Sequence, residues 1–343
     1  MNNEVTDPRR LLSRRRLFEL GAAAVGSAAV LSACGEGGTG APAGSAPTGP
    51  AEAFPVTITD KFGQVTIEEP PRTVASVGRT DHDVLLALGI IPASVYRFVP
   101  PMKRGVGAWA EPKLGPAQPE ILTNPISFEK VAALKPDMIL DVQSTGDEGE
   151  YRTLSQIAPT VGLPPGSAPN TVTWQESARV ISTAVGRGPD GEKLVKDTEA
   201  ELARTKAANP AFAGKTVSVL LGSAGQLGVY TTADSRTQVA TGLGLTPSPY
   251  VSKLPRTSFF APLSPELVNE ADADVVIVLT REGLNKAAVF SQYPTLANST
   301  IAKEGRLAVV ENFNVSLAFA AGSVLSIPYA VNGLVPVLKT VLR

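Results

Sequence analysis

The sequence predicts an α/β fold of two parallel-rich α/β lobes joined by a single long connecting helix, with a ligand cleft between the lobes. Short runs of β-branched residues alternate with stretches of helical pattern, which is typical of parallel sheets covered by helices. Two consecutive helical stretches interrupt this alternation, and strands resume at Gly214. A second series of strands after a long helix indicates a second lobe rather than an extension of the first sheet.

Five strands can be placed in chain order. They are the runs 73–77, 138–142, 217–221, 275–279 and 307–311. A helix over 173–185 ends at the breaker Gly186 to Pro189, and a second helix over 190–208 would be about 28 Å long. The predicted divisions are an N-terminal lobe over 54–187, a connecting helix over 188–210 and a C-terminal lobe over 211–343.

The segment 312–338 contains no charged residue. It is interrupted by Gly322, Pro328, Gly333 and Pro336, which an uninterrupted membrane span would not favour. Amphipathic helices packed on a sheet are therefore predicted here.

An export signal is predicted over residues 1–33, because five arginines precede the mostly apolar run 17–33. The run ends at Leu31 to Cys34, a pattern that lipoprotein signal peptidase accepts, so Cys34 is the predicted lipidation site. Residues 13–18 are similar to the twin-arginine signal, and both the Tat and the Sec route stay open. The alternative is an uncleaved anchor helix with an incidental cysteine.

Residues 34–53 are predicted to comprise the lipidated cysteine and a flexible tether, because Gly, Pro, Ala and Thr dominate and no large apolar residue is present. A lipid on Cys34 and this tether would place the folded body outside the cytoplasmic membrane, on its outer face.

The composition excludes several functional classes. The net charge is −1, so no basic excess is present to bind nucleic acid. One His and one Cys cannot build a zinc cage, a disulfide framework or a redox pair, and bare zinc or manganese would lack ligands. No phosphate-binding or nucleophile-elbow motif is present, and His82 is expected to lie in a capped turn at the surface. A binding role without catalysis or cofactor is predicted.

Several blocks of sequence, taken in order, resemble one family of proteins. Residues 59–76 are similar to an opening hairpin and first strand, and 83–92 to a first helix and turn. The most specific block is 128–140. The blocks 263–267 and 273–278 repeat its order of a helix followed by a strand in the second half of the chain. Together the blocks resemble the periplasmic binding proteins that serve ABC importers of iron-siderophores, haem and vitamin B12.

This resemblance implies two lobes on one stiff helix that open by small motions, and an ABC permease as partner. It also implies that one acidic residue on each lobe docks onto permease arginines, and the matching positions are Glu129 and Glu266. Solubility alone is the alternative role for either glutamate.

Candidate ligand-binding residues lie where strands are expected to end, since open α/β sheets bind ligands there. They are Arg79, Tyr96, Arg97, Trp109, Gln143, Tyr230, Arg256, Phe259, Phe260, Arg281 and Phe313. Arginines beside aromatic rings suit a large planar or chelated anion. Each residue has an alternative role as a solvated Arg or a core ring, as do Lys103 and Arg104 in the same region.

The resemblance, together with these residues, implies a monomeric, lipid-anchored solute-binding protein that captures an iron(III)-siderophore and delivers it to an ABC permease, with no direct protein ligand to the metal. One alternative is a haem or corrinoid cargo, with Tyr96, Tyr230 or His82 as haem ligand. Another is a cell-envelope interaction lipoprotein without a transport role.

Overall fold

The computed structural model describes residues 53–223, 226–281 and 284–342. The chain divides into two compact units, Met1–Ser45 and Ala46–Arg343. All described residues belong to the second unit. The predicted signal over 1–33, Cys34 and nearly all of the tether over 34–53 lie outside them.

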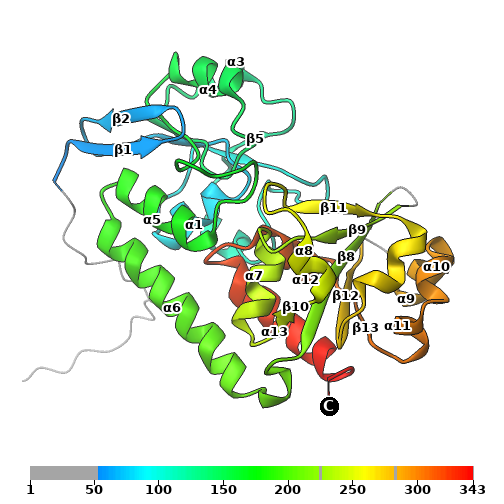
Figure 1. Ribbon diagram of the computed structural model, residues 1–343. Coiled ribbons are helices and arrows are strands. Elements are labelled where there is room, and N and C mark those ends of the chain that lie inside the picture. The colour runs from blue at the N-terminus through cyan, green and yellow to red at the C-terminus, as the bar shows by residue number, and fades with distance from the viewer. Residues whose placement is uncertain (1–52, 224–225, 282–283, 343) are drawn as a thin grey trace, which may run out of the picture. The chain divides into compact units, whose positions relative to one another are not determined.

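A five-stranded, wholly parallel sheet forms the N-terminal lobe, in the order β5-β4-β3-β6-β7. Its edge strand β5 is labelled in Figure 1. Its strands are β3 (Val74–Ser76), β4 (Ser94–Tyr96), β5 (Glu120–Leu122), β6 (Met138–Leu140) and β7 (Thr160–Val161). The hairpin predicted at the start of the body is confirmed as β1 (Val56–Asp60) and β2 (Gly63–Ile67). Asp60 closes its turn by accepting from Phe62 N and Gly63 N, and ties it to β7 by accepting from Gly162 N.

Five helices accompany this sheet. They are α1 (Asp81–Ala87), α2 (Glu111–Leu114), α3 (Phe128–Ala133), α4 (Glu148–Ser155) and α5 (Trp174–Ala184). Three of them begin at a side-chain cap, since Ser127, Asp147 and Thr173 each accept a hydrogen bond from a backbone amide three residues on. Such caps satisfy amides that the first turn leaves without an intrahelical partner.

The predicted connecting helix is confirmed as α6 (Gly188–Ala207), which has Pro189 in its first turn. It packs on α5 at one end and on α7 and α13 of the C-terminal lobe further along. The approach to α5 is close, because a Cβ on Gly191 would lie 1.7 Å from Ser182 Oγ. A larger residue at position 191 would push the two helices apart, so this glycine sets how the connector joins the first lobe.

A six-stranded mixed sheet forms the C-terminal lobe, in the order β11-β9-β8-β12-β13 with β10 beside the start of β8. Its strands are β8 (Thr216–Ser223), β9 (Gln226–Tyr230), β10 (Thr246–Pro247), β11 (Phe260–Leu263), β12 (Val275–Leu279) and β13 (Leu307–Val310). All pairings are parallel except those of β9 with β8 and β11. Only two residues separate β8 from β9, which suffices for a hairpin and not for a parallel crossover.

The helical elements of this lobe include the connector's short continuation and the uncharged segment. They are η1 (Pro210–Phe212), α7 (Ser235–Gly242), α8 (Pro249–Lys253), η2 (Pro265–Ala271), α9 (Lys286–Gln292), α10 (Pro294–Ala297), α11 (Thr300–Lys303), α12 (Phe313–Ala321) and α13 (Ser326–Lys339). The segment 312–338 forms α12 and α13, which pack on each other, and Gly322 ends α12 in the left-handed conformation. Within the described ranges, each helix is too short or too polar to cross a membrane.

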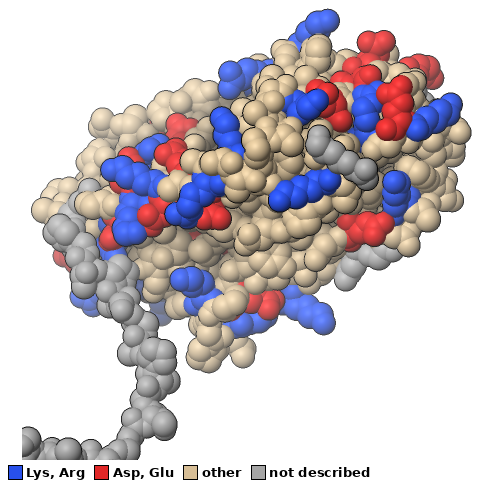
Figure 2. Space-filling model, turned by 90° about the horizontal axis from the view of Figure 1, so that it is seen from below, with Lys and Arg blue, Asp and Glu red and all other residues tan. Residues whose placement is uncertain are grey.

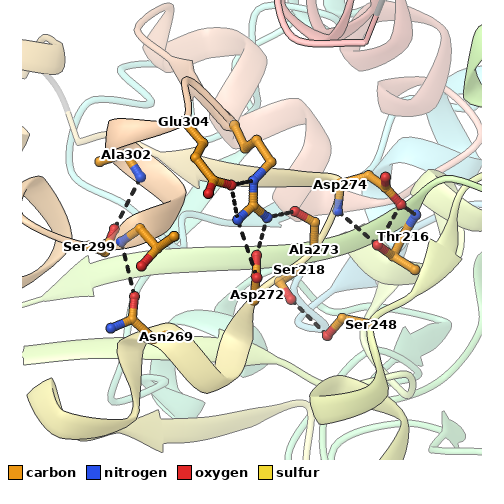
Figure 3. Close-up of polar contacts among 12 residues, drawn as sticks. Thr216, Ser218, Ser248, Asn269, Asp272, Ala273, Asp274, Ser299, Ala302 and Glu304 are labelled. Atoms are coloured by element: carbon orange, nitrogen blue, oxygen red, sulfur yellow. Dashed lines mark hydrogen bonds and ion pairs between the residues drawn. The ribbon is translucent and has the colours of Figure 1, made fainter.

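One aspartate fastens the start of the sheet in each lobe. In the N-terminal lobe, Asp137 precedes β6 and accepts from Arg72 N and Thr73 N, just before β3. In the C-terminal lobe, Asp274 precedes β12 and accepts from the amide and hydroxyl of Thr216 at the start of β8, each at 2.8 Å (Figure 3). These contacts lie at the amino ends of the strands, so the carboxyl ends remain available for ligands.

Charges of both signs are interspersed on the surface. The face seen in Figure 2 carries Lys and Arg side chains among Asp and Glu side chains. This agrees with the net charge of −1.

Candidate functional site

A cavity of about 410 Å³ lies between the two lobes, at the carboxyl ends of their strands. The N-terminal lobe contributes Arg79 and the loop 98–101. The C-terminal lobe contributes the ends of β8, β9 and β12 and one side of α12. Both its position and its volume are typical of small-molecule sites in open α/β sheets. We call it the interlobe cavity.

Arg79 follows β3 and reaches across to the other lobe. Its Nη2 donates to Ala320 O at 2.9 Å, and its Cζ lies 4.7 Å from the centre of the Phe98 ring. Burial, together with the positive charge of Arg236, lowers the pKa of Arg79 to about 10. The group remains a cation at neutral pH, so the cavity holds a desolvated positive charge that an anionic ligand would stabilise.

A second arginine is fixed behind the Tyr230 ring. Arg236 Cζ lies 3.8 Å from the centre of that ring. Asp234 caps α7 by accepting from Arg236 N at 2.8 Å, and its other oxygen accepts from Arg236 Nη1 at 2.7 Å. This arrangement holds the guanidinium in one position while both ionic partners are buried.

Three arginines and three aromatic residues therefore line one cavity. They are Arg79, Arg236 and Arg281, and Phe98, Tyr230 and Phe313. Guanidinium groups bind carboxylate and catecholate oxygens in planar, paired hydrogen bonds, and rings cover the apolar surface of a chelate. The lining has no counterpart of a catalytic acid–base pair among the described residues, and no three His, Cys, Asp or Glu side chains there are placed to hold a metal ion.

A second, smaller cavity adjoins the first, and the two share Arg79 and Phe98. It has a volume of about 270 Å³ and is lined largely by polar residues of the N-terminal lobe, among them Tyr96, Gln143, Asp141 and Glu150. Burial, followed by the charge of Glu150, raises the pKa of Tyr96, so its phenol is protonated at neutral pH.

Asp81 fixes the backbone of the loop after β6, which contributes Gln143 to this second cavity. Its carboxylate accepts from Val142 N at 2.8 Å and Gln143 N at 3.0 Å, which fixes the loop after β6. Burial raises the pKa of Asp81 to about 7 despite these two hydrogen bonds. A Cβ on Gly78 would lie 2.0 Å from the Asp81 carboxylate, so only glycine fits there.

The structure brings six of the predicted ligand residues to these two cavities. Arg79, Tyr230, Arg281 and Phe313 line the interlobe cavity, and Tyr96 and Gln143 line the second. Phe259 and Phe260 stand one layer behind, since the Phe260 ring packs edge-on to the Tyr230 ring at 5.2 Å. Arg97 lines neither cavity, and its amide donates to Leu122 O.

Two predicted ligand residues lie elsewhere. Trp109 is 9% exposed, and its Nε1 donates to Asp83 Oδ2 at 2.8 Å in the core, because the long loop turns inward before α2. Arg256 is exposed and lines shallow hollows beside α7. Neither position faces the interlobe cavity, so their expected placement at the cleft was wrong.

The expected surface position of His82 was also wrong. It is 1% exposed, because α1 begins at Asp81 and buries its whole first turn. Lys103 and Arg104 line a separate surface hollow, and Arg104 donates to Gly115 O and Ala117 O.

Sequence reasoning missed Arg236, Asp141 and Glu150. Arg236 belongs to a helix rather than to a strand end, and only the capping pattern begun by Asp234 places it beside β9. Asp141 directly follows β6, so its position at the end of a strand could have indicated a site residue. The sequence around Glu150 on α4 contains no such indication.

Comparisons with known proteins bear on the family and the fold. The family model described as "Periplasmic binding protein" matches residues 74–312. A crystal structure of a periplasmic solute binding protein from Mycobacterium smegmatis is 31% identical, with a TM-score of 0.74 over 84% of this chain and 99% of that one. The Streptococcus pneumoniae protein PiaA, solved in complex with ferrichrome, is 28% identical, with a TM-score of 0.72 over 84% of this chain and 98% of that one.

One curated relative is the Fe(3+) dicitrate-binding periplasmic protein FecB of Escherichia coli. It is 30% identical over 141 residues, which are 39% of this chain and 44% of FecB. The chain thus spans less than half the length of the curated relatives it matches. The similar structures have two α/β lobes and a long helix between them, which confirms the predicted fold class.

Proposed function

The chain belongs to the periplasmic binding protein family, a family of binding proteins rather than enzymes, and from this membership we propose that it captures an iron(III)-siderophore for an ABC importer. The observation that carries the proposal is the convergence of three arginines and three aromatic residues on the interlobe cavity. Such a lining complements a chelate that carries anionic oxygens around a shielded metal. No direct bond from the protein to the iron is needed.

The cargo of two relatives supports a ferric chelate. PiaA is solved with ferrichrome and FecB is named for Fe(3+) dicitrate. One of these chelates is a hydroxamate and the other a carboxylate, so the relatives support the class of cargo and leave the chelating group open.

We propose further that the protein is exported and held at the outer face of the cytoplasmic membrane by a lipid on Cys34. The support is the basic and apolar pattern of 1–33, which ends in a motif for lipoprotein processing. Export by the Tat or the Sec route, followed by removal of the signal over 1–33, would leave the tether over 34–53 between the lipid and the folded body.

Delivery to the permease is proposed to use Glu129 and Glu266. Each glutamate is exposed in the first turn of a short helix, two residues after a serine, Ser127 or Ser264, at the N-cap. Hydrogen bonds with its own backbone amide and then with that serine lower the pKa of each glutamate. The same local arrangement in both lobes offers two fixed negative charges to a partner with paired arginines.

Glu129→Ala combined with Glu266→Ala is expected to reduce ferric-chelate uptake by cells to about a tenth or less, because two charge-complementary contacts with the permease are lost. Binding of the chelate to the purified protein should be unchanged, since neither residue lines the interlobe cavity. Uptake of radioactive iron measures the first result and calorimetry the second. Glu148→Ala with Glu304→Ala is the matched control, because both are exposed glutamates elsewhere on the two lobes. If the Glu129→Ala, Glu266→Ala protein supported uptake at the wild-type rate, these two glutamates would not contribute to docking on the permease.

The proposed cargo is tested by calorimetric titration of the full chain with ferrichrome, ferric citrate, ferrioxamine B, haem and cyanocobalamin. We expect saturable one-to-one binding of at least one ferric chelate, with a Kd of about 1 μM or tighter. Tryptophan fluorescence is a poorer measure, because neither Trp109 nor Trp174 lines the cavity. Binding of haem or cyanocobalamin alone would transfer the proposal to those cargoes. A flat response to all five would overturn a transport role and favour an envelope-interaction lipoprotein.

A further inference from the structure

The second cavity has a chemistry opposite to that of the interlobe cavity. Its lining includes Asp141, Glu150, Tyr96, Asn124, Gln143 and Asn170, and we call it the acidic pocket. It shares Arg79 and Phe98 with the interlobe cavity, so the two cavities are adjacent and, among the described residues, only these two side chains line both.

Asp141 is the central group of the acidic pocket. The residue is 1% exposed, and its Oδ1 has no hydrogen-bond partner within the described ranges, although a hydrogen bond with the Ser144 side chain acts on the carboxyl group. A buried carboxyl oxygen without a partner costs free energy, so its persistence at a cavity wall points to a ligand that completes it.

The charges that act on Asp141 are themselves acidic, namely Asp81, Glu150 and Asp60. Asp81 is occupied by the two amides of the loop after β6, and Asp60 by two amides of the opening hairpin and the amide of Gly162 after β7. Asp141 and Glu150 are therefore the two carboxyl groups left facing the pocket.

The residues that line the pocket do not neutralise this charge. Arg79 is its one basic lining residue among those described, and its guanidinium is directed to Ala320 O and the Phe98 ring. Gln143 donates its amide nitrogen to Val172 O at 2.8 Å, which leaves the amide oxygen as an acceptor. The pocket thus offers acceptors to a guest that brings several donors.

Burial, and then neighbouring carboxylates, raise the pKa of Asp141 and of Glu150. A cation bound between these two groups would act in the opposite direction and lower both pKa values, because a nearby positive charge favours the ionised carboxylate.

We infer that the acidic pocket is a subsite for a protonated primary amine, of the kind that a cargo carries as a side arm. The inference rests on the proposed function for the placing of the rest of the cargo in the interlobe cavity. An ammonium group supplies three donors and one positive charge, which match two carboxyl groups and an amide oxygen. The cargo would then be a chelate with anionic oxygens at one end and a cation at the other.

The test uses pentylammonium chloride as the probe and 1-pentanol as its uncharged counterpart, each titrated into the full chain at pH 8 by ligand-observed NMR. We expect the ammonium to bind at least tenfold more tightly than the alcohol, because hydrogen bonds between charged groups are the stronger kind. Asp141→Asn should bring this ratio to about one, and Glu150→Gln should reduce it severalfold. Glu148→Gln is the matched control, since it lies on the same helix and is exposed, and the ratio should stay at the wild-type value.

Equal binding of the two probes to the wild type would overturn the subsite, as would an Asp141→Asn protein that keeps the preference. Asn has the shape of the neutral acid, so thermal unfolding near the wild-type temperature verifies the variant's fold, and Glu150→Gln gives a second measure. The ferric-chelate titration is separate. Chelate binding without ammonium binding would remove only the subsite, and ammonium binding without any chelate binding would remove only the proposed function.

Discussion

Arg79→Ala is expected to weaken the binding of an anionic ferric chelate by about 10- to 100-fold, the largest loss from any single residue of the interlobe cavity. A hydrogen bond between charged groups in a desolvated site contributes about 1.5–3 kcal/mol, which corresponds to that factor. Arg79 also borders both cavities and contacts the Phe98 ring, so its removal changes the wall that divides them.

The measurement is calorimetry with the chelate that binds the wild type most tightly. Arg79→Lys should fall between wild type and alanine, because it keeps the charge and loses the planar pair of donors. Arg256→Ala is the control, since this arginine is exposed beside α7 and away from the cavity. An alanine variant at position 79 that binds as tightly as wild type would mean that the cargo does not meet this guanidinium.

The pH dependence of this contribution follows from the pKa of Arg79, which burial and Arg236 lower to about 10. A base whose pKa is about 10 keeps its proton at all pH values well below 10. Affinity for an anion should therefore show no loss through this group between pH 6 and 8. It should decrease as the pH approaches 10, and a bound anion should shift that decrease upward because it favours the charged guanidinium.

The sequence could predict five of the strands, the connector and the site residues that closely follow two of those strands. Arg79 and Gln143 were found in this way, since the carboxyl end of a strand has a known place in a parallel sheet. Trp109 was misplaced because the position of a side chain in a long loop depends on which way the loop turns. This one turns toward Asp83, a partner that is separated from Trp109 by 26 residues.

Arg236, Asp141 and Glu150 required the structure for a different reason. Arg236 acts at the cavity only because α7 begins beside the end of β9, and its ring contact with Tyr230 is a tertiary one. The acidic pocket arises because the fold brings Asp141, after β6, and Glu150, on α4, to the same cavity. No local sequence pattern shows that these two residues line one pocket. Local pattern predicts where elements begin and end, whereas electrostatic character arises from groups that the fold brings together.

Asp83→Ala is expected to lower the free energy of unfolding by about 3 kcal/mol or more, the largest destabilisation we predict. Asp83 Oδ2 accepts from Trp109 Nε1 at 2.8 Å and from Ser323 Oγ, which lies 240 residues away between α12 and α13. The carboxylate is fully buried and therefore joins the N-terminal lobe to the C-terminal lobe within the core. Alanine would leave two buried donors without an acceptor and would open a small cavity.

Urea unfolding followed by circular dichroism measures this loss, and a double-mutant cycle with Ser323→Ala separates the interlobe hydrogen bond from the contact with Trp109. Ser323→Ala alone should cost about 1 kcal/mol, because it removes one donor and leaves the Trp109 contact intact. Asp197→Ala is the control, since its ion pair with Lys193 on α6 is exposed and should be worth about 0.5 kcal/mol or less. If Asp83→Ala were no more harmful than Asp197→Ala, the two lobes would not depend on this carboxylate. The connecting helix and the apolar contacts would then be what holds the two lobes together.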